Sequence, residues 1–184
     1  MLAAEDLKNV LRYSEIKNLG RHESSADHSW KVALSALALT KESDKFDFQK
    51  IIKIALIHDL PEIHTGNTDY VLVAGKKDND LASQQNKEAP WQLNNEYSGL
   101  LAEYQAQTSP EARYVNAISK IESLVYLLKL GYQYFDRPDL IPNYADEAVS
   151  EFPTLKPYLK MVKSKLKSEY TKGKLGWREE YDCD

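Results

Sequence analysis

Apolar residues recur at helical spacing after Ser109, and this pattern limits the fold more than any other feature of the chain. Between residues 110 and 131 they are Tyr114, Val115, Ile118, Ile121, Leu124, Val125 and Leu128. A repeat of about 3.6 residues is typical of an amphipathic helix with one face in a core. Ser109 is a favoured N-cap residue, and Pro110 suits the first helical position. The segment is therefore predicted to be a long helix that ends near Gly131.

Other segments carry helical spacing, and none sustains the alternation of apolar and polar residues that marks a strand. They are residues 3–16, 25–40, 48–59, 80–107, 139–150 and 155–172. Pro90 is expected to kink or break the fourth of them. Gly and Pro number only seven each, so long stretches contain no helix breaker. We therefore predict an all-α fold, with a loop at residues 64–70, where Gly66 and Asn67 lie.

The segment 25–40 is apolar around most of its circumference. Trp30, Leu34 and Leu37 join Val32 and Ala33 in covering the helix on nearly every side. A helix that is apolar all round is typical of the centre of a helical protein. We therefore expect this helix to be buried.

The charge and composition of the chain exclude some classes of partner. The formal net charge is −4, so no overall basic field is present to hold a nucleic-acid backbone. No run approaches the roughly 18 apolar residues of a membrane span, and the N-terminal residues lack the apolar region of a signal peptide. The single cysteine, Cys183, allows no intrachain disulfide. We expect a cytoplasmic protein that binds neither nucleic acid polymers nor membranes.

Imidazole and carboxylate groups lie inside or at the ends of the apolar segments. His28 lies within residues 25–40, and His58 and Asp59 end the segment 48–59. Burying such groups without partners costs several kcal/mol. Neutral imidazole nitrogens and carboxylate oxygens are natural ligands of a divalent metal ion, which would remove this cost. A lone histidine is more often a structural residue, but the three together form a candidate metal site.

Two motifs in these segments resemble those of the HD-domain phosphohydrolases. The first is Glu23-Ser-Ser-Ala-Asp-His28-Ser-Trp30, and the second is Ala55-Leu-Ile-His58-Asp59-Leu-Pro-Glu62. The resemblance extends over about residues 7–130 and is nearest to the branch of the bacterial 5′-deoxynucleotidases. It implies a helical domain, one divalent metal ion and hydrolysis of a phosphomonoester or a related phosphate.

The resemblance also implies roles for individual residues. His28, His58 and Asp59 match the first three metal ligands of the family. Glu62 matches the acidic residue that orients or deprotonates the attacking water. Substrate-binding roles are implied for two arginines before the first motif, and a lysine after the fourth ligand position could approach a phosphate; these residues are Arg12, Arg21 and Lys120.

The chain departs from the family pattern at two positions. The fourth ligand, normally aspartate, falls at Ser119, and a hydroxyl is a poorer ligand for a hard cation than a carboxylate. The family usually has aspartate after Thr-Gly, and this chain has Asn67, which cannot act as a base. Asp69 could substitute in part for that missing carboxylate. Each departure removes one negative charge from the expected centre, although three ligands and water still hold catalytic zinc in other proteins.

We therefore expect a single compact HD-type helical domain over residues 1–184. It would have a core at about 7–130, C-terminal helices at about 139–172 and a tail at 173–184. The expected function is metal-dependent removal of phosphate from a (deoxy)nucleoside monophosphate or a similar small ester, in a homodimer. The residue pattern does not distinguish Mn, Co, Mg, Zn, Fe or Ni. Two alternatives stay open: a degenerate domain that binds a nucleotide or phosphate without turnover, and a non-enzymatic helical interaction module.

Overall fold

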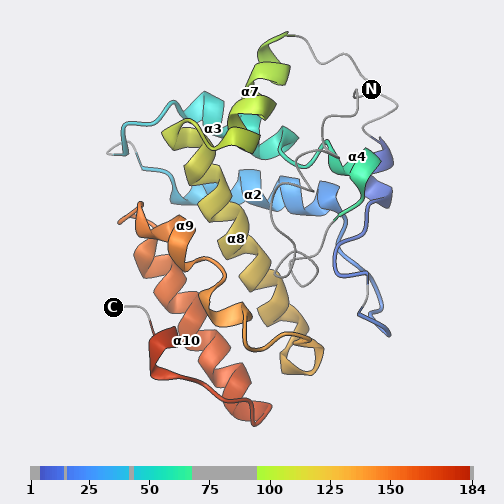
Figure 1. Cartoon of the computed structure of the whole chain (residues 1–184), viewed down its shortest axis with the longest axis vertical. Helices are drawn as coiled ribbons and strands as arrows, with labels where there is room; N and C mark the ends of the chain where they lie inside the picture. The colour runs from blue at the N-terminus through green and yellow to red at the C-terminus, as the bar shows by residue number, and fades with distance from the viewer. Residues whose placement is uncertain (1–4, 15, 42–43, 68–94, 183–184) are drawn as a thin grey trace.

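The structure, a computed structural model, describes residues 5–14, 16–41, 44–67 and 95–182. Its α-helices are α2 (Ser25–Leu39), α3 (Phe48–Ile57), α4 (Glu62–Thr65), α7 (Asn95–Ala106), α8 (Pro110–Leu130), α9 (Asp146–Ser150) and α10 (Lys156–Lys172) (Figure 1). Short 3-10 turns occur at Leu7–Asn9, Tyr132–Tyr134, Ile141–Asn143 and Glu179–Tyr181. No β-strand is present in the described ranges, so the predicted all-α fold is confirmed.

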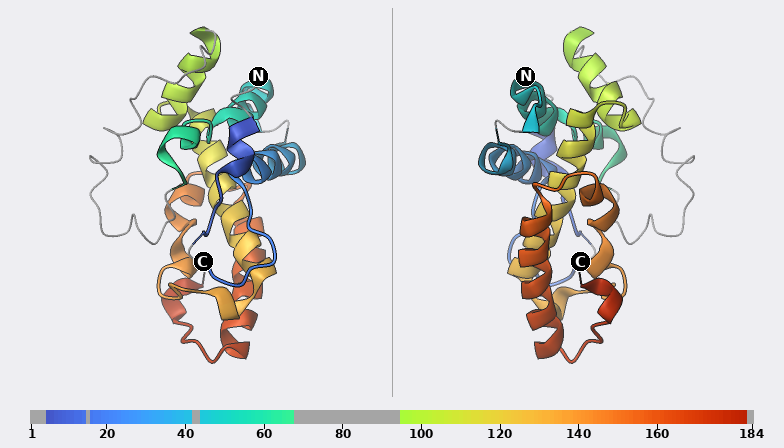
Figure 2. Two further views of the ribbon diagram at one scale, coloured as in Figure 1. Left: turned by 90° about the vertical axis from the view of Figure 1, so that its right-hand side faces the viewer. Right: turned by 90° about the vertical axis from the view of Figure 1, so that its left-hand side faces the viewer.

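The long helix α8 is the centre of the molecule. It packs against α2, α3, α7, α9 and α10. The two side views show α8 running from the end formed by α2, α3 and α7 to the end formed by α9 and α10 (Figure 2). The predicted apolar face of α8 is confirmed except at Val125, which is exposed, because Tyr114, Val115, Ile118 and Leu124 are fully buried. The helix therefore joins both halves of one hydrophobic core.

Side-chain caps define where the main helices begin. Ser24 accepts a hydrogen bond from the Asp27 backbone N–H, and the Asp27 carboxylate accepts one from the Ser24 N–H, which completes a capping box for α2. Asp47 caps α3, and Ser109 caps α8 as predicted. Gly131 ends α8 at a φ of 91°, a backbone conformation that favours glycine.

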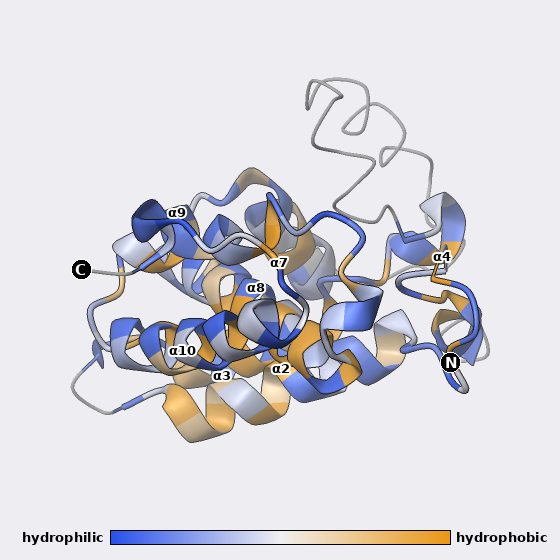
Figure 3. Ribbon diagram, turned by 90° about the horizontal axis from the view of Figure 1, so that it is seen from below, coloured by the Kyte–Doolittle hydropathy of each residue, from blue (hydrophilic) through white to orange (hydrophobic). Residues whose placement is uncertain are grey.

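The prediction that residues 25–40 are buried all round is wrong for one face. Helix α2 packs on α3 and α8 through Val32 and Ala36, which are fully buried. On the opposite face Trp30 is 61% exposed, and Leu34 and Leu37 are also exposed. Figure 3 shows apolar ribbon, drawn in orange, at the edge of the molecule near the labels of α2 and α3. Helix α2 thus lies at the surface, with an apolar side facing outward.

The predicted helix at residues 3–16 is also wrong beyond its first turn. The helical turn ends at Asn9, and the chain then pairs with the segment before α2 through an isolated antiparallel bridge between Leu11 and Ser24. The Arg12 N–H donates to the Glu23 carbonyl over 2.8 Å. These long-range bonds satisfy the backbone in place of helical ones. They also bring Arg12 beside Glu23, close to the start of α2.

The remaining segment predictions are confirmed in part. Residues 156–172 form α10 as expected, whereas the segment 139–150 contains only a 3-10 turn and the short helix α9. Of the predicted helix at 80–107, the described part is α7, and Pro90 lies outside the described residues. Within the described ranges no helix is both long and apolar enough to cross a membrane.

The Ser109 cap allows a test of the helix that organises the core. Replacing Ser109 by alanine removes the acceptor for the Ala112 N–H, so we expect Ser109→Ala to lower the free energy of unfolding by about 1 kcal/mol. Chemical denaturation measures this change. Ser168→Ala is the control, because Ser168 is exposed within α10, where alanine is the better helix former. Equal stability of Ser109→Ala and the wild type would contradict the assigned cap.

Candidate metal centre

Two histidines and an aspartate from neighbouring helices meet in the interior. His28 lies in α2, and His58 and Asp59 follow directly after α3. The ring centroids of the two histidines are 5.6 Å apart, and His58 Nε2 lies 3.2 Å from Asp59 Oδ1. One potential ligand atom from each of the three residues falls within 4.8 Å of the others. The structure therefore brings together the three ligands that the sequence predicts.

The end of α3 sets the direction of the His58 ring. His58 Nδ1 lies 2.8 Å from the Ala55 carbonyl oxygen and donates to it in the neutral ring. The lone pair is then on Nε2, the nitrogen nearer Asp59. The ring also packs edge-on against Tyr104 of α7, with centroids 5.1 Å apart. A hydrogen bond on one nitrogen that leaves the other free is the usual arrangement of a histidine ligand.

Two buried atoms of this cluster lack hydrogen-bond partners among the described residues. They are His58 Nε2 and Asp59 Oδ2. A buried polar atom without a partner costs about 1–3 kcal/mol. Both atoms can donate an electron pair, so a divalent cation between them would satisfy both. The side chains present therefore fit a metal ion of the kind that binds imidazole and carboxylate.

Burial also sets the protonation of the three candidate ligands. It lowers the pKa of His58 to about 4 and that of His28 well below its usual value, so both rings are neutral near pH 7. It raises the pKa of Asp59 to about 7, against the opposing effect of Arg12. Neutral imidazole is the form that binds metals. The Asp59 carboxyl group, by contrast, is protonated in part of the molecules near pH 7.

Ser119 faces the same centre from α8. Its hydroxyl lies 2.9 Å from His28 Nε2. Ser119, which stands where the family resemblance leads us to expect an aspartate, thus lies beside the candidate ligand His28. A serine there lies within hydrogen-bond distance of the nitrogen that a metal ion would use. It supplies no negative charge.

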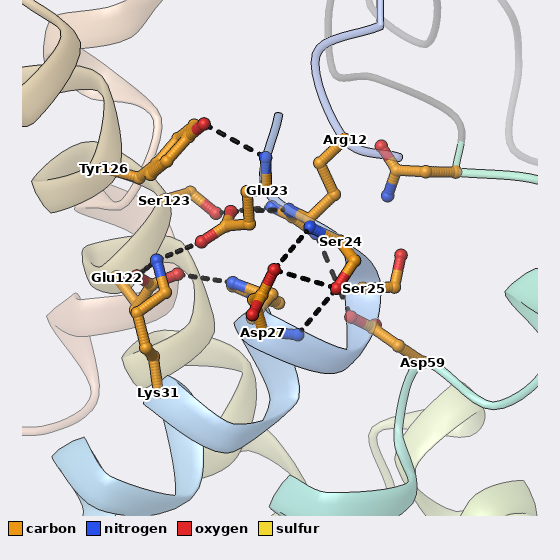
Figure 4. Close-up of polar contacts among 12 residues, drawn as sticks. Arg12, Glu23, Ser24, Ser25, Asp27, Lys31, Asp59, Glu122, Ser123 and Tyr126 are labelled. Carbon is orange, nitrogen blue, oxygen red and sulfur yellow. Dashed lines mark hydrogen bonds and ion pairs between the residues drawn. The ribbon is translucent and has the colours of Figure 1, made fainter. Parts of the chain in front are cut away.

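A network of charged groups begins at the other nitrogen of His28, and Figure 4 shows its members Glu122, Lys31, Glu23 and Arg12. His28 Nδ1 contacts a carboxylate oxygen of Glu122, whose second oxygen lies 2.6 Å from Lys31 Nζ. Lys31 also contacts Glu23, and Glu23 accepts a hydrogen bond of 3.1 Å from Arg12 Nε. The network therefore reaches from α8 to the N-terminal segment.

The charges of the centre do not balance within the protein. Four carboxylates and two cations lie around the neutral histidines: Asp59, Glu62, Glu23, Glu122, Arg12 and Lys31. Their formal charge is −2 when all are ionised. An aspartate at position 119 would make it −3. One divalent cation would therefore neutralise the centre as it stands in this chain.

Glu62 lies beside the candidate ligands at the start of α4. Ser25 Oγ donates to one of its oxygens over 2.5 Å, and Asn67 Nδ2 donates to the other over 2.9 Å. Burial, with the nearby charge of Asp59, raises the pKa of Glu62 to about 7. Asn67 thus holds Glu62 in place and is no base itself. An aspartate at position 67 would instead repel Glu62.

A pocket opens over the centre and follows one face of α8. The residues of α8 that line it are Asn116, Ser119, Lys120, Ser123, Leu124 and Leu127. The residues that line it from other parts of the chain are Arg12, Tyr13, Ile16, Asp59, Glu62, Asn67, Tyr104, Asp136, Arg137, Ile141 and Tyr144. Lys120 Nζ lies 5.1 Å from the centre of the Tyr144 ring. The pocket thus combines the candidate ligand Asp59 with cationic and aromatic side chains.

The structure does not bring every predicted site residue to this pocket. The Arg21 side chain is 81% exposed, pairs with Asp27 at 3.0 Å and does not line the pocket, so its role in binding substrate stays a prediction. Arg12 does line the pocket, and its NH2 group donates to Ser123 Oγ over 3.0 Å. Asp69, expected to substitute for the missing carboxylate, lies outside the described residues.

Three residues of the network were not predicted from the sequence. They are Glu23, Lys31 and Glu122. Helical spacing could have indicated two of them, because Lys31 comes three residues after His28 and Glu122 comes three residues after Ser119. Side chains at that spacing share a helix face. Spacing does not show, however, which charged neighbour of a ligand turns inward.

Comparisons with known proteins agree with the geometry. A family model described as an HD domain matches residues 4–137. The human 5′-deoxynucleotidase HDDC2 is 25% identical over 172 residues, which cover 89% of this chain and 80% of the human protein. The protein of the same name from Danio rerio is 30% identical over 125 residues, which cover 65% of this chain and 62% of that protein.

Solved structures share the fold. A structure described as a predicted metal-dependent phosphohydrolase from Magnetospirillum magnetotacticum gives a TM-score of 0.72 at 21% identity, covering 96% of this chain and 92% of that one. A conserved hypothetical protein from Pyrococcus furiosus gives a TM-score of 0.66 at 25% identity, covering 89% and 96%. The arrangement of helices around α8 is thus one that other proteins adopt.

The raised pKa of Asp59 predicts how metal binding depends on pH. Below pH 7 the carboxyl group holds a proton that a cation must displace, so we expect the association constant for Mn²⁺ to fall about tenfold per pH unit below 7. Above pH 7 it should level off, because His58 is already neutral. Calorimetric titration between pH 5.5 and 8 measures this dependence. Asp59→Asn should bind weakly without it, and a flat wild-type profile would show that Asp59 is not a ligand.

The position of Ser119 makes a second prediction. Ser119→Asp places a carboxylate beside His28 Nε2, so we expect Mn²⁺ to bind about tenfold more tightly or better. Ser119→Asn is the matched control, because it adds similar volume without charge. Equilibrium dialysis compares the three proteins. Equal affinity of Ser119→Asp and Ser119→Asn would mean that residue 119 does not face the ion.

Proposed function

The chain belongs to the HD domain family, and from this premise we propose that it is a metal-dependent phosphohydrolase. We further propose that it removes phosphate from a (deoxy)nucleoside monophosphate or a similar small ester. The observation that carries the proposal is the pair of buried atoms on His58 and Asp59 that lack hydrogen-bond partners among the described residues, with Glu62 beside Asp59 in the pocket. The names of the relatives, 5′-deoxynucleotidases in vertebrates and fission yeast, support a nucleotide-like substrate.

In this proposal His28, His58 and Asp59 hold the divalent ion. When bound, such an ion makes water a stronger acid and offsets the charge that develops on phosphoryl oxygens. Glu62 would take the proton from the attacking water as general base. Its pKa of about 7 suits that role near neutral pH, and Ser25 and Asn67 fix its two oxygens. Two neutral hydrogen-bond donors, Ser25 and Asn67, thus orient the proposed base Glu62.

Two cations in the pocket are placed to meet a phosphate. The Arg12 guanidinium is held by Glu23 and Ser123, so little side-chain freedom remains to be lost when a substrate binds. Lys120 lies on the pocket wall beside the Tyr144 ring. We propose that Arg12 and Lys120 bind the phosphate and that Tyr144 contacts the organic part of the ester.

One observation favours a second candidate function, binding without turnover. The Ser119 hydroxyl lies 2.9 Å from His28 Nε2, so its hydrogen bond would compete with an ion for that nitrogen. A weakly held ion could leave a pocket that binds phosphate esters but does not cleave them. Turnover distinguishes this possibility from the hydrolase.

We also propose that the protein forms a homodimer through the exposed apolar side of α2. Trp30, Leu34 and Leu37 lie along this side. Exposed apolar surface of this kind commonly marks a contact with another protein. The surface alone would also suit a helical interaction module, but that function would leave the metal-facing groups without a role.

Phosphate release tests the proposed function. We expect the protein to release phosphate from nucleoside monophosphates when Mn²⁺, Co²⁺, Mg²⁺ or Zn²⁺ is added. Glu62→Gln should lower kcat about 10²- to 10⁴-fold while the metal stays bound, because the base is lost. The wild-type rate should rise with pH up to about 7 as Glu62 loses its proton.

His58→Ala is the control for the metal requirement, and it should lose both metal and activity. Release that survives in His58→Ala would show that the assigned site is wrong. No release by the wild type with any of the four metals and any nucleotide would favour the binding protein.

A further inference from the structure

Helix α8 contacts both nitrogens of the His28 ring. Ser119 Oγ lies 2.9 Å from Nε2, and Glu122 contacts Nδ1. The two residues are three positions apart, so they lie on one face of α8, the face that packs on α2. Glu122 is 5% exposed, and Figure 4 shows it pointing from α8 toward α2. Helix α8 therefore contacts the His28 ring at both of its nitrogens.

The two contacts differ in what they require of the ring. A neutral imidazole carries one N–H, and an ionised carboxylate can only accept a hydrogen bond. A carboxylate at Nδ1 therefore places the hydrogen on that nitrogen. Nε2 then keeps its lone pair, which accepts from Ser119 in the protein and would bind an ion. The opposite tautomer would point an N–H at the centre and exclude a cation.

We propose that Glu122 is a positioning residue that sets the tautomer and ring orientation of His28 for metal binding. The proposal rests on the metal centre of the proposed function, although the tautomer itself can be observed without metal or substrate. Carboxylates that accept from the second nitrogen of a histidine ligand commonly strengthen metal binding tenfold to a hundredfold. Glu122 therefore contributes to the centre without touching the ion or the substrate.

Lys31 favours the ionised form of Glu122 that this role requires, against burial, which raises the pKa of the Glu122 carboxyl group. Its ammonium lies 2.6 Å from the Glu122 oxygen that does not contact His28, and it also contacts Glu23. The Tyr126 ring supports it, with its centre 4.7 Å from Nζ. A cation beside a carboxylate favours the ionised state. Lys31 thus connects the orientation of His28 to the charged network that also holds Arg12.

The test compares Glu122→Leu, Glu122→Gln and a control in metal-free protein at pH 8. Long-range ¹H–¹⁵N spectra of the imidazoles report each tautomer, with His28→Asn used to assign the His28 signals. We expect the Nδ1–H form in the wild type and in Glu122→Gln, whose amide oxygen still accepts. Glu122→Leu removes the acceptor, so the Nε2–H form should appear.

Metal affinity supplies the second measurement. We expect the dissociation constant for Mn²⁺ to rise tenfold to a hundredfold in Glu122→Leu and by a smaller factor in Glu122→Gln, which loses the charge. Glu111→Leu is the control, because Glu111 is a buried carboxylate on the same helix that contacts Asp47 and Lys50 instead of His28. It should keep both the tautomer and the affinity.

Each outcome has one meaning for Glu122. A folded Glu122→Leu with the wild-type tautomer and affinity would overturn the positioning role. If Glu122→Leu does not fold, Glu122→Gln decides, and wild-type affinity in that variant would overturn the role. A wild type that shows the expected tautomer but releases no phosphate would count against the proposed function alone.

Discussion

The clustering of four carboxyl groups around two buried, neutral histidines where α2, α3 and α8 meet is the constraint on which the rest of the structure depends. Two neutral histidines lie there among four carboxylates, and the cations Arg12 and Lys31 pair with these carboxylates. Such a cluster is unfavourable in a hydrophobic core unless something balances it. The capped helices hold the groups in place, and the long helix α8 supplies Ser119 on the side of the centre and Glu122 behind it. The fold is thus built around a position that suits a divalent cation.

Much of the fold and part of the site could be predicted from the sequence. The apolar period after Ser109 predicted α8, and motif spacing predicted that His28, His58 and Asp59 would meet. Helical spacing could not predict that the chain near Arg12 leaves the helix, because a bridge to the start of α2 decides that conformation. Spacing could not place Arg21 either, since its exposed position beside Asp27 depends on the path of the chain after that bridge.

The two departures from the family pattern alter charge more than geometry. Ser119 still faces His28, and Asn67 still reaches Glu62. At position 67 an amide donates a hydrogen bond to Glu62, and at position 119 a neutral hydroxyl contacts His28 Nε2. Asn67 holds the candidate base, and Ser119 makes a hydrogen bond that an ion at His28 Nε2 would displace. Both residues therefore stay in the pocket, and each lacks the negative charge of the aspartate expected from the family resemblance.

The most direct test of the account is X-ray absorption at the metal edge of the Co²⁺-loaded protein. Fine structure reports the kind and number of ligands without reference to activity. The account predicts scattering from two imidazole rings and a shell of oxygen ligands, because His28, His58 and Asp59 bind the ion and Ser119 adds no carboxylate. A spectrum without imidazole scattering would place the ion elsewhere and contradict the central claim.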